Sequence, residues 1–506
     1  MMLDTGQPRL ADLAEIARRA MIQHGLDPDV PPEATRQLAE IAGPADDDDP
    51  SIRDLRALPW CSIDDDDSRD LDQLTVARAG QDGSATILVA IADVDALVQL
   101  GSAIDRHAQV NTVTVYTPGI IFPLLPERLS TDLTSLADGQ DRLAVVVEMD
   151  VDREGEIGRS DVYRARVHNY AKLGYPGVAA WLDGDAPMPK ALAAVKGLDE
   201  QLRLQDAVAQ RLCTRRHQRG ALDIQTVEAR PVVENGVVVG LEEETKSRSR
   251  QLIEDFMIAA NGSTAELLRE RGFPSIRRVV RAPERWDLLQ KMASQAGDSL
   301  PDTPDPVALS QFMARRRAAD PAGYPDLSLS VVKLMGSGDY AVERPGEPPA
   351  GHFGLAVRDY GHATAPNRRY PDLLTQRLLK AAVAGQPVPY ALDELDRLAE
   401  HCTRQEDQAR KVERLARKAA SAAYLGQHLG ETFDALVTGV NEGGTWVRTL
   451  TPPVEGKLVA GEAGLDVGDR VRVRLQSIDP GRGFVDFERG DRRQESGVRR
   501  GEQQPR

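Results

Sequence analysis

The stretch Cys61-Ser62-Ile63-Asp64-Asp65-Asp66-Asp67-Ser68-Arg69-Asp70-Leu71-Asp72-Gln73 carries six carboxylates within nine positions. Like charges this close repel one another, so such a cluster is costly unless a cation neutralises it. Carboxylate oxygens suit a hard ion such as Mg²⁺ or Mn²⁺ and do not suit Zn²⁺. The apolar runs at 74–77 and 86–91 predict strands directly after this stretch. An acidic loop beside buried strands favours a metal site more than an acidic tail does.

Two other interpretations of the acidic stretch have to be weighed. Acidic loops are often only solvated turns, and residues 46–49, which end at Pro50, have that character. A helix-loop-helix calcium site requires Gly at its sixth position and Glu at its twelfth. Counted from Asp64, these positions hold Arg69 and Thr75, so the stretch fits this type of site poorly. The spacing alone leaves the metal site and the solvated turn as open alternatives.

Composition limits the class of protein. A chain of 506 residues with 41% hydrophobic and 28% charged residues is typical of a water-soluble protein of about three domains. It has no apolar run of about 20 residues, the length of a membrane span. Residues 1–8 lack the apolar core of a signal peptide. Three cysteines far apart, at Cys61, Cys213 and Cys402, argue against a disulfide framework and for a reducing compartment. We therefore predict a cytoplasmic protein.

The net charge of −16 argues against a protein coated with nucleic acid, but it permits a channel lined by basic groups. For each basic cluster the alternative is a solvated helix face. The clusters are 215–219, 246–250, 277–278, 315–317 and 368–369.

The periodicity divides the chain into four parts. Residues 1–50 contain two short helical stripes and an acidic linker, which would fit a helix-turn-helix module or a helical cap on the main domain. Residues 51–429 mix strands and helices without regular alternation, so we predict an α+β domain. The expected strands are 86–92, 111–116, 143–149, 221–225 and 278–281, and the expected helices are 188–213, 250–270, 304–317, 371–384 and long helices within 392–429.

The last two parts differ in texture. Residues 430–488 contain five short alternating segments separated by glycine turns, which predicts a small five-stranded OB-type β-barrel. In this segment Trp446 is a candidate for stacking on a nucleic-acid base. Residues 489–506 are polar and rich in arginine, and we predict a disordered tail.

Four motifs in a fixed order resemble the ribonuclease II / ribonuclease R (RNB-type) family of 3′→5′ exoribonucleases. They are the Ile-Asp and Asp-Leu-Asp pattern of 63–72, the tyrosine segment 115–130, the helix-like run 252–261 and the segment 352–373, which contains the Asn-Arg-Arg-Tyr-Pro-Asp sequence. Members of that family end in an OB-fold RNA-binding domain, as predicted here for 430–488. They usually begin with two cold-shock domains, and the roughly 60 residues available here are too few for even one. We expect that RNA-gripping surface to be missing or replaced.

The resemblance implies a hydrolytic exoribonuclease. It would degrade single-stranded RNA from the 3′ end to nucleoside 5′-monophosphates as a monomer, with Mg²⁺ as cofactor and Mn²⁺ as an alternative. Gln73 stands where the family has a fourth aspartate, and Ile224 stands where it often has a phenylalanine. Because of these two departures, a catalytically impaired RNA-binding regulator is the main alternative. A phosphoesterase acting on small nucleotides is a more distant one.

The same resemblance assigns roles to individual residues. It implies metal ligation by Asp64, Asp70, Asp72 and Gln73, and catalytic roles for Asp70, Asp72, Tyr175 and Arg368. It implies RNA contacts from Tyr116, Glu254, Ile224, Arg369 and Trp446. Ile224 takes the place of a phenylalanine that clamps the terminal base in the family. An aliphatic side chain loses part of the aromatic stacking energy, so we expect a looser hold on the 3′ end.

Overall fold

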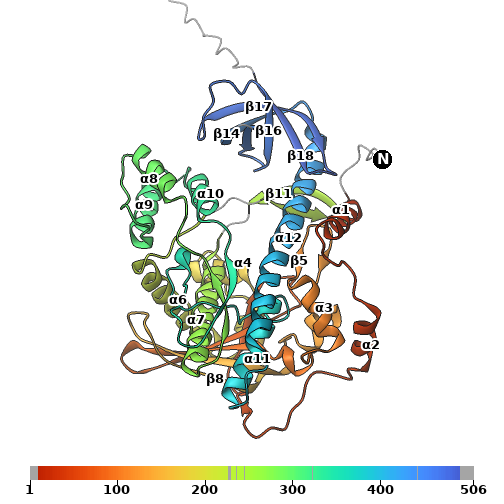
Figure 1. Ribbon diagram of the computed structural model, residues 1–506, viewed down its shortest axis with the longest axis vertical. Helices are drawn as coiled ribbons and strands as arrows, with labels where there is room; N and C mark the ends of the chain where they lie inside the picture. Colours follow the sequence, from red (N-terminus) through yellow and green to blue (C-terminus); the bar gives the residue numbers. More distant parts are fainter. Residues whose placement is uncertain are drawn as a thin grey trace, which may run out of the picture. The chain divides into compact units, whose positions relative to one another are not determined.

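The computed structural model describes residues 9–225, 229–234, 236–243, 246–321, 323–441 and 443–490 (Figure 1). The chain forms two compact units. The core unit is Ala17–Thr226 with Thr245–Glu413, and the barrel unit is Met1–Ile16 with Val227–Glu244 and Arg414–Arg506. The helices α1 (Leu10–Gln23) and α12 (Leu392–Leu425) contribute residues to both units. The domain limits expected from the sequence stay a prediction.

A seven-stranded sheet organises the core unit, with the strand order β1-β8-β7-β4-β3-β2-β9. Its strands are β1 (Arg53–Asp54), β2 (Cys61–Asp64), β3 (Gln73–Ala79), β4 (Ala85–Ala92), β7 (Asp141–Val151), β8 (Ile157–His168) and β9 (Ala171–Gly174). The pairs β1–β8 and β2–β9 are parallel, and the other neighbours are antiparallel. The central strand β4 is buried almost throughout, which explains why its sequence is a continuous apolar run and not an alternating one.

Helices pack on this sheet and form the main hydrophobic core with it. They are α4 (Tyr175–Asp183), α5 (Lys190–Ala193), α6 (Leu198–Gln218), α7 (Arg248–Glu270) and α11 (Tyr370–Val383). α7 begins where the hydroxyl of Ser247 accepts a hydrogen bond from the backbone N–H of Arg250. α11 begins with Pro371 in its first turn, where a missing N–H costs nothing. The α+β class predicted from the sequence is confirmed.

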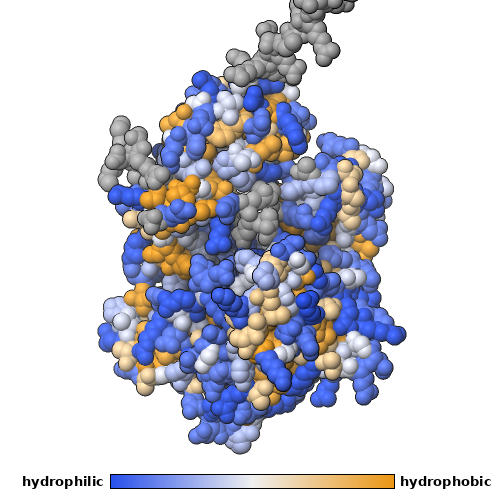
Figure 2. Space-filling view, turned by 180° about the vertical axis from the view of Figure 1, so that it is seen from behind, coloured by the Kyte–Doolittle hydropathy of each residue, from blue (hydrophilic) through white to orange (hydrophobic). Residues whose placement is uncertain are grey.

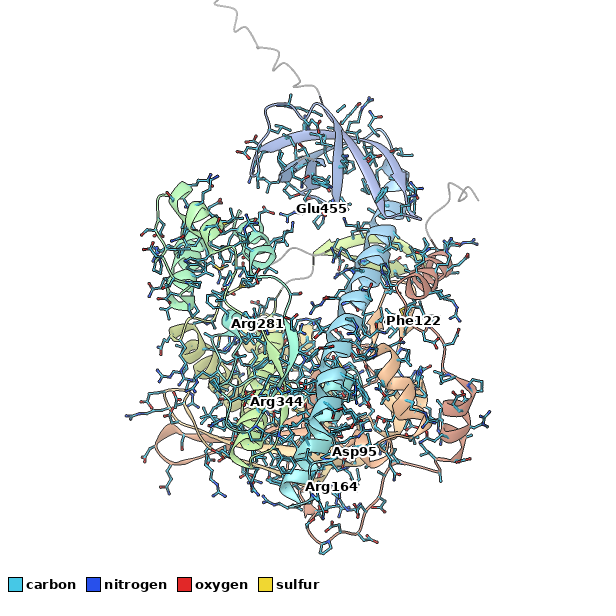
Figure 3. The ribbon with its side chains drawn as sticks, in the orientation of Figure 1. Asp95, Phe122, Arg164, Arg281, Arg344 and Glu455 are labelled. Atoms are coloured by element: carbon cyan, nitrogen blue, oxygen red, sulfur yellow. The ribbon has the colours of Figure 1, made fainter. Side chains whose placement is uncertain are left out.

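A buried ion network fixes α11 against the sheet. Lys380 of α11 reaches the carboxylates of Asp93 and Asp95, both at 2.8 Å, just after β4. Arg377 of α11 donates to Asp95 at 2.8 Å, and Arg164 of β8 donates to Asp93 at 3.0 Å. Asp95 and Arg164 are labelled in Figure 3. Because α11 is held this way, the loop that leads into it also has a defined position.

Smaller elements complete the core unit. Three helices, α8 (Trp286–Gln295), α9 (Pro306–Ala319) and α10 (Tyr324–Met335), share a separate apolar cluster. The remaining elements are α2 (Pro32–Glu40), α3 (Ala103–Asn111), the two-stranded pairs β5 (Val115–Tyr116) with β6 (Ile121–Phe122) and β12 (Ser275–Val279) with β13 (Asp339–Glu343), and the short helical turns η1 (Gln81–Gly83), η2 (Val94–Ala96), η3 (Leu129–Leu133) and η4 (Phe353–Leu355).

The barrel unit contains a closed five-stranded barrel with the order β14-β15-β16-β18-β17, as predicted. Its strands are β14 (Thr432–Asn441), β15 (Gly444–Thr449), β16 (Glu455–Ala460), β17 (Arg470–Asp479) and β18 (Phe484–Arg489), and the turn η5 (Gly426–His428) precedes them. Its core includes Val437, Leu458 and Phe487, which pack with the end of α12. The hairpin β10 (Ala229–Glu234) and β11 (Val237–Glu243) packs in the same unit. Of the predicted tail, residues 491–506 lie outside the described residues.

Several predicted elements differ in the structure. The helix predicted at 188–213 is two helices, because Gly197, at φ +76°, caps the second one. The strand predicted at 111–116 is wrong in its first part, because α3 extends to Asn111. The strand predicted at 221–225 is wrong: the N–H of Leu222 donates to the carbonyl of Gly354, and the side chain packs in the cluster of α8, α9 and α10. The backbone hydrogen bond and the apolar packing of Leu222 are thus supplied by loop and helix residues, and no strand pairing is required.

No helix in the described part of the chain is long and apolar enough to cross a membrane. On the face shown in Figure 2, hydrophilic side chains predominate, and the hydrophobic side chains lie in separate patches between them.

Candidate active site

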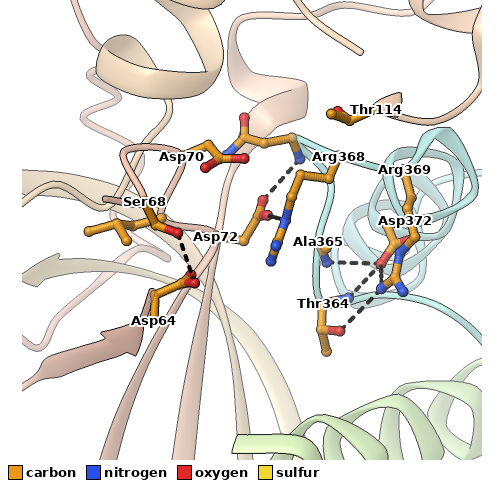
Figure 4. A network of polar contacts seen from close by, with 12 residues as sticks. Asp64, Ser68, Asp70, Asp72, Thr114, Thr364, Ala365, Arg368, Arg369 and Asp372 are labelled. Carbon is orange, nitrogen blue, oxygen red and sulfur yellow. Dashed lines mark hydrogen bonds and ion pairs between the residues drawn. The ribbon is translucent and has the colours of Figure 1, made fainter. Parts of the chain in front are cut away.

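The centre of the site is a pair of residues 296 positions apart, Asp72 and Arg368 (Figure 4). Asp72 directly precedes β3, and its carbonyl accepts the N–H of Ala92, so it continues the ladder with β4. Its side chain is fully buried. One carboxylate oxygen accepts the backbone N–H of Asn367 at 3.0 Å, and the other accepts Nε of Arg368 at 2.6 Å. Each of the two oxygens therefore accepts one hydrogen bond from the same loop.

Asp70 lies two residues before Asp72, and its charge is one of the causes that raise the pKa of Asp72. Burial raises the pKa of Asp72 to about 6, although the nearby Arg368 acts in the opposite direction. Burial also raises the pKa of Asp70, with Arg368 opposing the shift and Asp64 adding to it. For Arg368, burial disfavours the charge, but Asp72, Tyr116 and Asp64 hold its pKa well above the usual range. The site therefore combines crowded carboxylates with one strongly cationic group.

Asp64 ends β2 and is nearly buried. Its Oδ1 accepts the hydroxyl of Ser68 at 3.0 Å and the N–H of Asp65 at 2.8 Å. β2 runs parallel to β9 with Asp64 beside Gly174, so Tyr175, the first residue of α4, follows directly. Burial and the charge of Asp64 raise the pKa of the Tyr175 phenol. The sheet register therefore places a carboxylate next to a phenol that keeps its proton.

Arg250 of α7 connects Tyr175 to Asp65 of the acidic stretch. Its guanidinium lies 4.5 Å from the ring centroid of Tyr175 and donates to Asp65 at 2.5 Å. Sequence reasoning placed Arg250 only in a basic cluster. Its position at the start of the expected helix 250–270, four residues before Glu254 on the same helical face, was the signal that could have identified it.

Tyr116 approaches the site from the other side. It is the last residue of β5, and its hydroxyl donates to Asp70 at 3.4 Å. The residue is 42% exposed, so part of the ring is available to a ligand. Its backbone N–H donates to Glu413 at 3.0 Å.

Three other predicted residues have partners elsewhere in the core unit, and a fourth belongs to the barrel unit. Glu254 pairs with Lys246 at 2.9 Å. Ile224 packs against the cluster of α8, α9 and α10. Arg369 donates to Asp372, as described below. Trp446 lies in β15 of the barrel unit, with the Lys457 ammonium 6.0 Å from its ring.

Gln73 lies on the opposite face of its strand from Asp72. Gln73 of β3 lies opposite Ile91 of the neighbouring strand β4. Because side chains alternate along a strand, Gln73 shares its face of the sheet with Thr75. Thr75 donates to Gln205 of α6 at 2.7 Å. The structure therefore does not bring Gln73 together with the carboxylates.

The chain matches the family description "RNB domain" over residues 52–385, which include every member of this group. The chain belongs to the RNB family. Residues 431–490 match "RNase II-type exonuclease C-terminal S1 domain". The family suggested by the four sequence motifs is thus confirmed.

Relatives named Ribonuclease R match most of this RNB chain. The Vibrio parahaemolyticus protein is 31% identical over 80% of this chain and 49% of its own length. The Aquifex aeolicus protein is 30% identical over 86% of this chain and 64% of its own length. The chain thus spans less than two thirds of these relatives.

Solved structures show the same fold. Apo Mycoplasma genitalium RNase R superposes with a TM-score of 0.84 at 22% identity, over 94% of this chain and 78% of its own. Yeast Ssd1, described as a pseudonuclease, gives a TM-score of 0.72 at 18% identity, over 89% of this chain and 56% of its own.

The carboxylates of the RNB domain fit a hard cation only in part. Among the described residues, no group of three or more His, Cys, Asp or Glu side chains converges to hold a metal ion. Asp72 is already bonded to the Arg368 loop. Asp64 and Asp70 remain, and burial together with the charge of Asp64 disfavours ionisation of Asp70. Mg²⁺ is commonly held by one or two carboxylates, water and substrate phosphates, and this pair fits that arrangement.

Proposed function

We propose that this chain is a hydrolytic 3′→5′ exoribonuclease that depends on a divalent metal ion and releases nucleoside 5′-monophosphates. The observation that carries the proposal is the pairing of Asp72 with Arg368, beside Asp70 and Asp64, within an RNB domain. We further propose Mg²⁺ as the ion, single-stranded RNA 3′ ends as substrate, and action as a monomer in the cytoplasm, where buried free cysteines such as Cys61 stay reduced.

Arg368 would bind the scissile phosphate. Its Nε donates to Asp72, which fixes the plane of the guanidinium, and the Nη groups are the donors for phosphoryl oxygens. Because Asp72 is buried and rigidly held, the guanidinium is oriented before substrate arrives. Pre-oriented donors stabilise charge that develops on the phosphoryl oxygens in the transition state.

Asp64 and Asp70 would hold the metal ion. When bound, such an ion supplies counter-charge to the phosphate and lowers the pKa of an attacking water molecule. The hydroxyl of Tyr116 donates a hydrogen bond to Asp70 and helps to hold this carboxylate in place. The ring of Tyr116 is partly exposed beside it. That ring would stack on the terminal base.

Tyr175 would act as a hydrogen-bond donor. Burial and the neighbouring Asp64 keep its phenol protonated, and Arg250 packs over the ring and restricts it. A protonated phenol next to the metal carboxylates can donate to a phosphoryl oxygen.

The alternative, a catalytically impaired RNA-binding regulator, rested mainly on Gln73. Alternation along β3 directs the Gln73 side chain to the same face as Thr75, away from Asp72. The missing negative charge at Gln73 therefore has no direct effect on Asp70 and Asp72. The substitution therefore gives no specific support to an inactive protein.

The test is a single-stranded RNA labelled at its 5′ end, incubated with the full chain and Mg²⁺. We expect a ladder that shortens from the 3′ end, 5′-monophosphate products, and loss of activity when the metal is chelated. Asp72→Asn should reduce the rate at least 100-fold. Asp67→Asn is the matched control, because Asp67 is an exposed carboxylate of the same acidic run. Shortening from the 5′ end, or full activity of Asp72→Asn, would contradict the proposal.

A further inference from the structure

Asp372 is a fully buried carboxylate at the start of α11 that has no part in the chemistry described so far. Its Oδ1 accepts the backbone N–H groups of Thr364 at 2.8 Å and Ala365 at 2.9 Å (Figure 4). The same oxygen accepts Nη2 of Arg369 at 2.7 Å, and Oδ2 accepts Nε of Arg369 at 2.8 Å. All four donors belong to the segment 364–369, which we name the arginine loop.

The arginine loop is also the segment that holds Asp72. Its Asn367 N–H and Arg368 Nε both donate to that carboxylate. Asp372 therefore binds the first two residues and the last residue of the loop, and Asp72 binds Asn367 and Arg368 between them. The N–H groups of Arg368 and Arg369 donate to the carbonyl of Ala365 at 3.0 and 2.9 Å, so the two ends are connected by a tight turn.

The flanks of the loop have further anchors. Asn261 of α7 accepts the N–H of Ala363 at 2.8 Å. On the other side, the carbonyl of Arg368 accepts the N–H of Thr114, and the N–H of Tyr370 donates to Thr112. The backbone of Arg368 is thus fixed, and Asp372 is the anchor that controls where the turn begins.

We infer that Asp372 is a positioning residue that sets the orientation of Arg368, an inference that rests on the proposed function. Asp372 acts through the backbone of the turn and through Arg369, whose Nε and Nη2 it binds. The RNA contact predicted for Arg369 stays a prediction, and its Nε and Nη2 are bound to Asp372. Without the anchor, the guanidinium of Arg368 would sample several orientations, and the loss would fall on the chemical step more than on RNA affinity.

A double-mutant cycle tests this inference, with Asp372→Asn, Arg368→Lys and the double variant compared with the wild type. The readouts are the single-turnover cleavage rate at saturating enzyme and the Kd for RNA without metal. We expect Asp372→Asn to slow cleavage about 30- to 100-fold and to change Kd less than about threefold. We expect the double variant to be no more than about threefold slower than Arg368→Lys alone. Effects that multiply would overturn the inference.

The matched control is Glu343→Gln. Glu343 is likewise a buried carboxylate of the core unit, paired with Arg277 at 2.8 Å, but it lies on β13 outside the arginine loop. We expect it to lower the Tm by an amount similar to that of Asp372→Asn and to leave the cleavage rate within about twofold of wild type. Equal slowing by both variants would reduce Asp372 to a general stabilising role.

A measurement that does not depend on activity separates this inference from the proposed function. Hydrogen exchange of the peptide covering 363–369 should rise at least tenfold in Asp372→Asn beyond the change seen in Glu343→Gln. Unchanged protection would overturn the inference, even in a protein that degrades RNA. If Asp372→Asn does not fold, Asn261→Ala removes the neighbouring anchor and takes its place in the same cycle. A wild-type protein that leaves RNA intact would contradict only the proposed function.

Discussion

Removal of Arg368 should destabilise the core unit, because it leaves a buried charge without its partner. Asp72 is fully buried, and in Arg368→Ala its carboxylate would keep only the N–H of Asn367. Loss of a hydrogen bond to a charged group costs about 1.5–3 kcal/mol, and breaking a buried ion pair costs about 3–5 kcal/mol. The Arg368 side chain is 29% exposed, so water can reach the gap. We therefore expect a loss of about 2–3 kcal/mol.

The assay is thermal unfolding in a chelating buffer, so that no metal compensates the charge. For a unit of several hundred residues, 1 kcal/mol corresponds to roughly 1–2 °C, and the expected decrease in Tm is about 3–5 °C. In the Asp72→Asn background no buried charge remains, so removal of Arg368 should cost less than about 1 kcal/mol. The control is Arg69→Ala, whose exposed pair with Glu127 should contribute almost nothing. An equal cost of Arg368→Ala in both backgrounds would refute the reasoning.

Two further predictions concern stability. Burial raises the pKa of Asp255 to about 6, although Arg216 opposes the shift, so the stability that protonation provides is complete below about pH 4 and is lost as pH rises through 6. Between pH 4 and 7 the wild type should lose up to about 3 kcal/mol relative to Asp255→Asn, and Tm values that run parallel would contradict this. In the barrel, a Cβ at Gly456 would lie 2.6 Å from both the Phe487 ring and the Val485 carbonyl. Gly456→Ala should therefore lower the temperature of the barrel's unfolding transition by several degrees in calorimetry. An unchanged transition temperature would contradict this packing.

Local patterns in the sequence were sufficient for the elements whose signal lies within a few residues. The apolar run at 86–91 and the alternating segments of 430–488 predicted β4 and the barrel, because burial pattern is a local property of a strand. The two-residue spacing of Asp70 and Asp72 indicated that they share a face, and in the structure the charge of Asp70 contributes to the raised pKa of Asp72. The resemblance of the four motifs indicated that Arg368 belongs with these acids.

Sequence patterns are less informative where a residue's partners are distant in the chain or where the face of a strand has to be assigned. Gln73 was grouped with its neighbours by position, although alternation along β3 sends it to the opposite face. Ile224 was assigned to the substrate by its place in a motif, but it packs with α8, α9 and α10. Asp372 accepts N–H groups seven and eight residues earlier in the chain, and no local pattern encodes such a contact.

The basic clusters show why a count of charges predicts function poorly. Arg277 and Arg278, which could have been a solvated helix face or an RNA contact, lie on β12 and pair with Glu343 and Glu406. In the cluster 315–317, Arg315 and Arg317 pair with Asp298 and Asp223. Much of the basic charge is thus neutralised by acids within the chain, which is consistent with a net charge of −16.

In the Arg368-Arg369 dipeptide, two adjacent arginines have different partners: Arg368 pairs with Asp72, and Arg369 pairs with Asp372. Residue 369 has an extended backbone, with φ −137° and ψ 124°, and consecutive side chains on extended chain point in opposite directions. Arg368 therefore reaches Asp72, and Arg369 reaches Asp372. The first lies beside the carboxylates that would meet substrate, and the second fixes the loop that carries the first. Of the two adjacent guanidinium groups, that of Arg368 would therefore contact the phosphate and that of Arg369 would hold the loop in position. Substitution of either arginine should slow the same step, the cleavage of the phosphodiester.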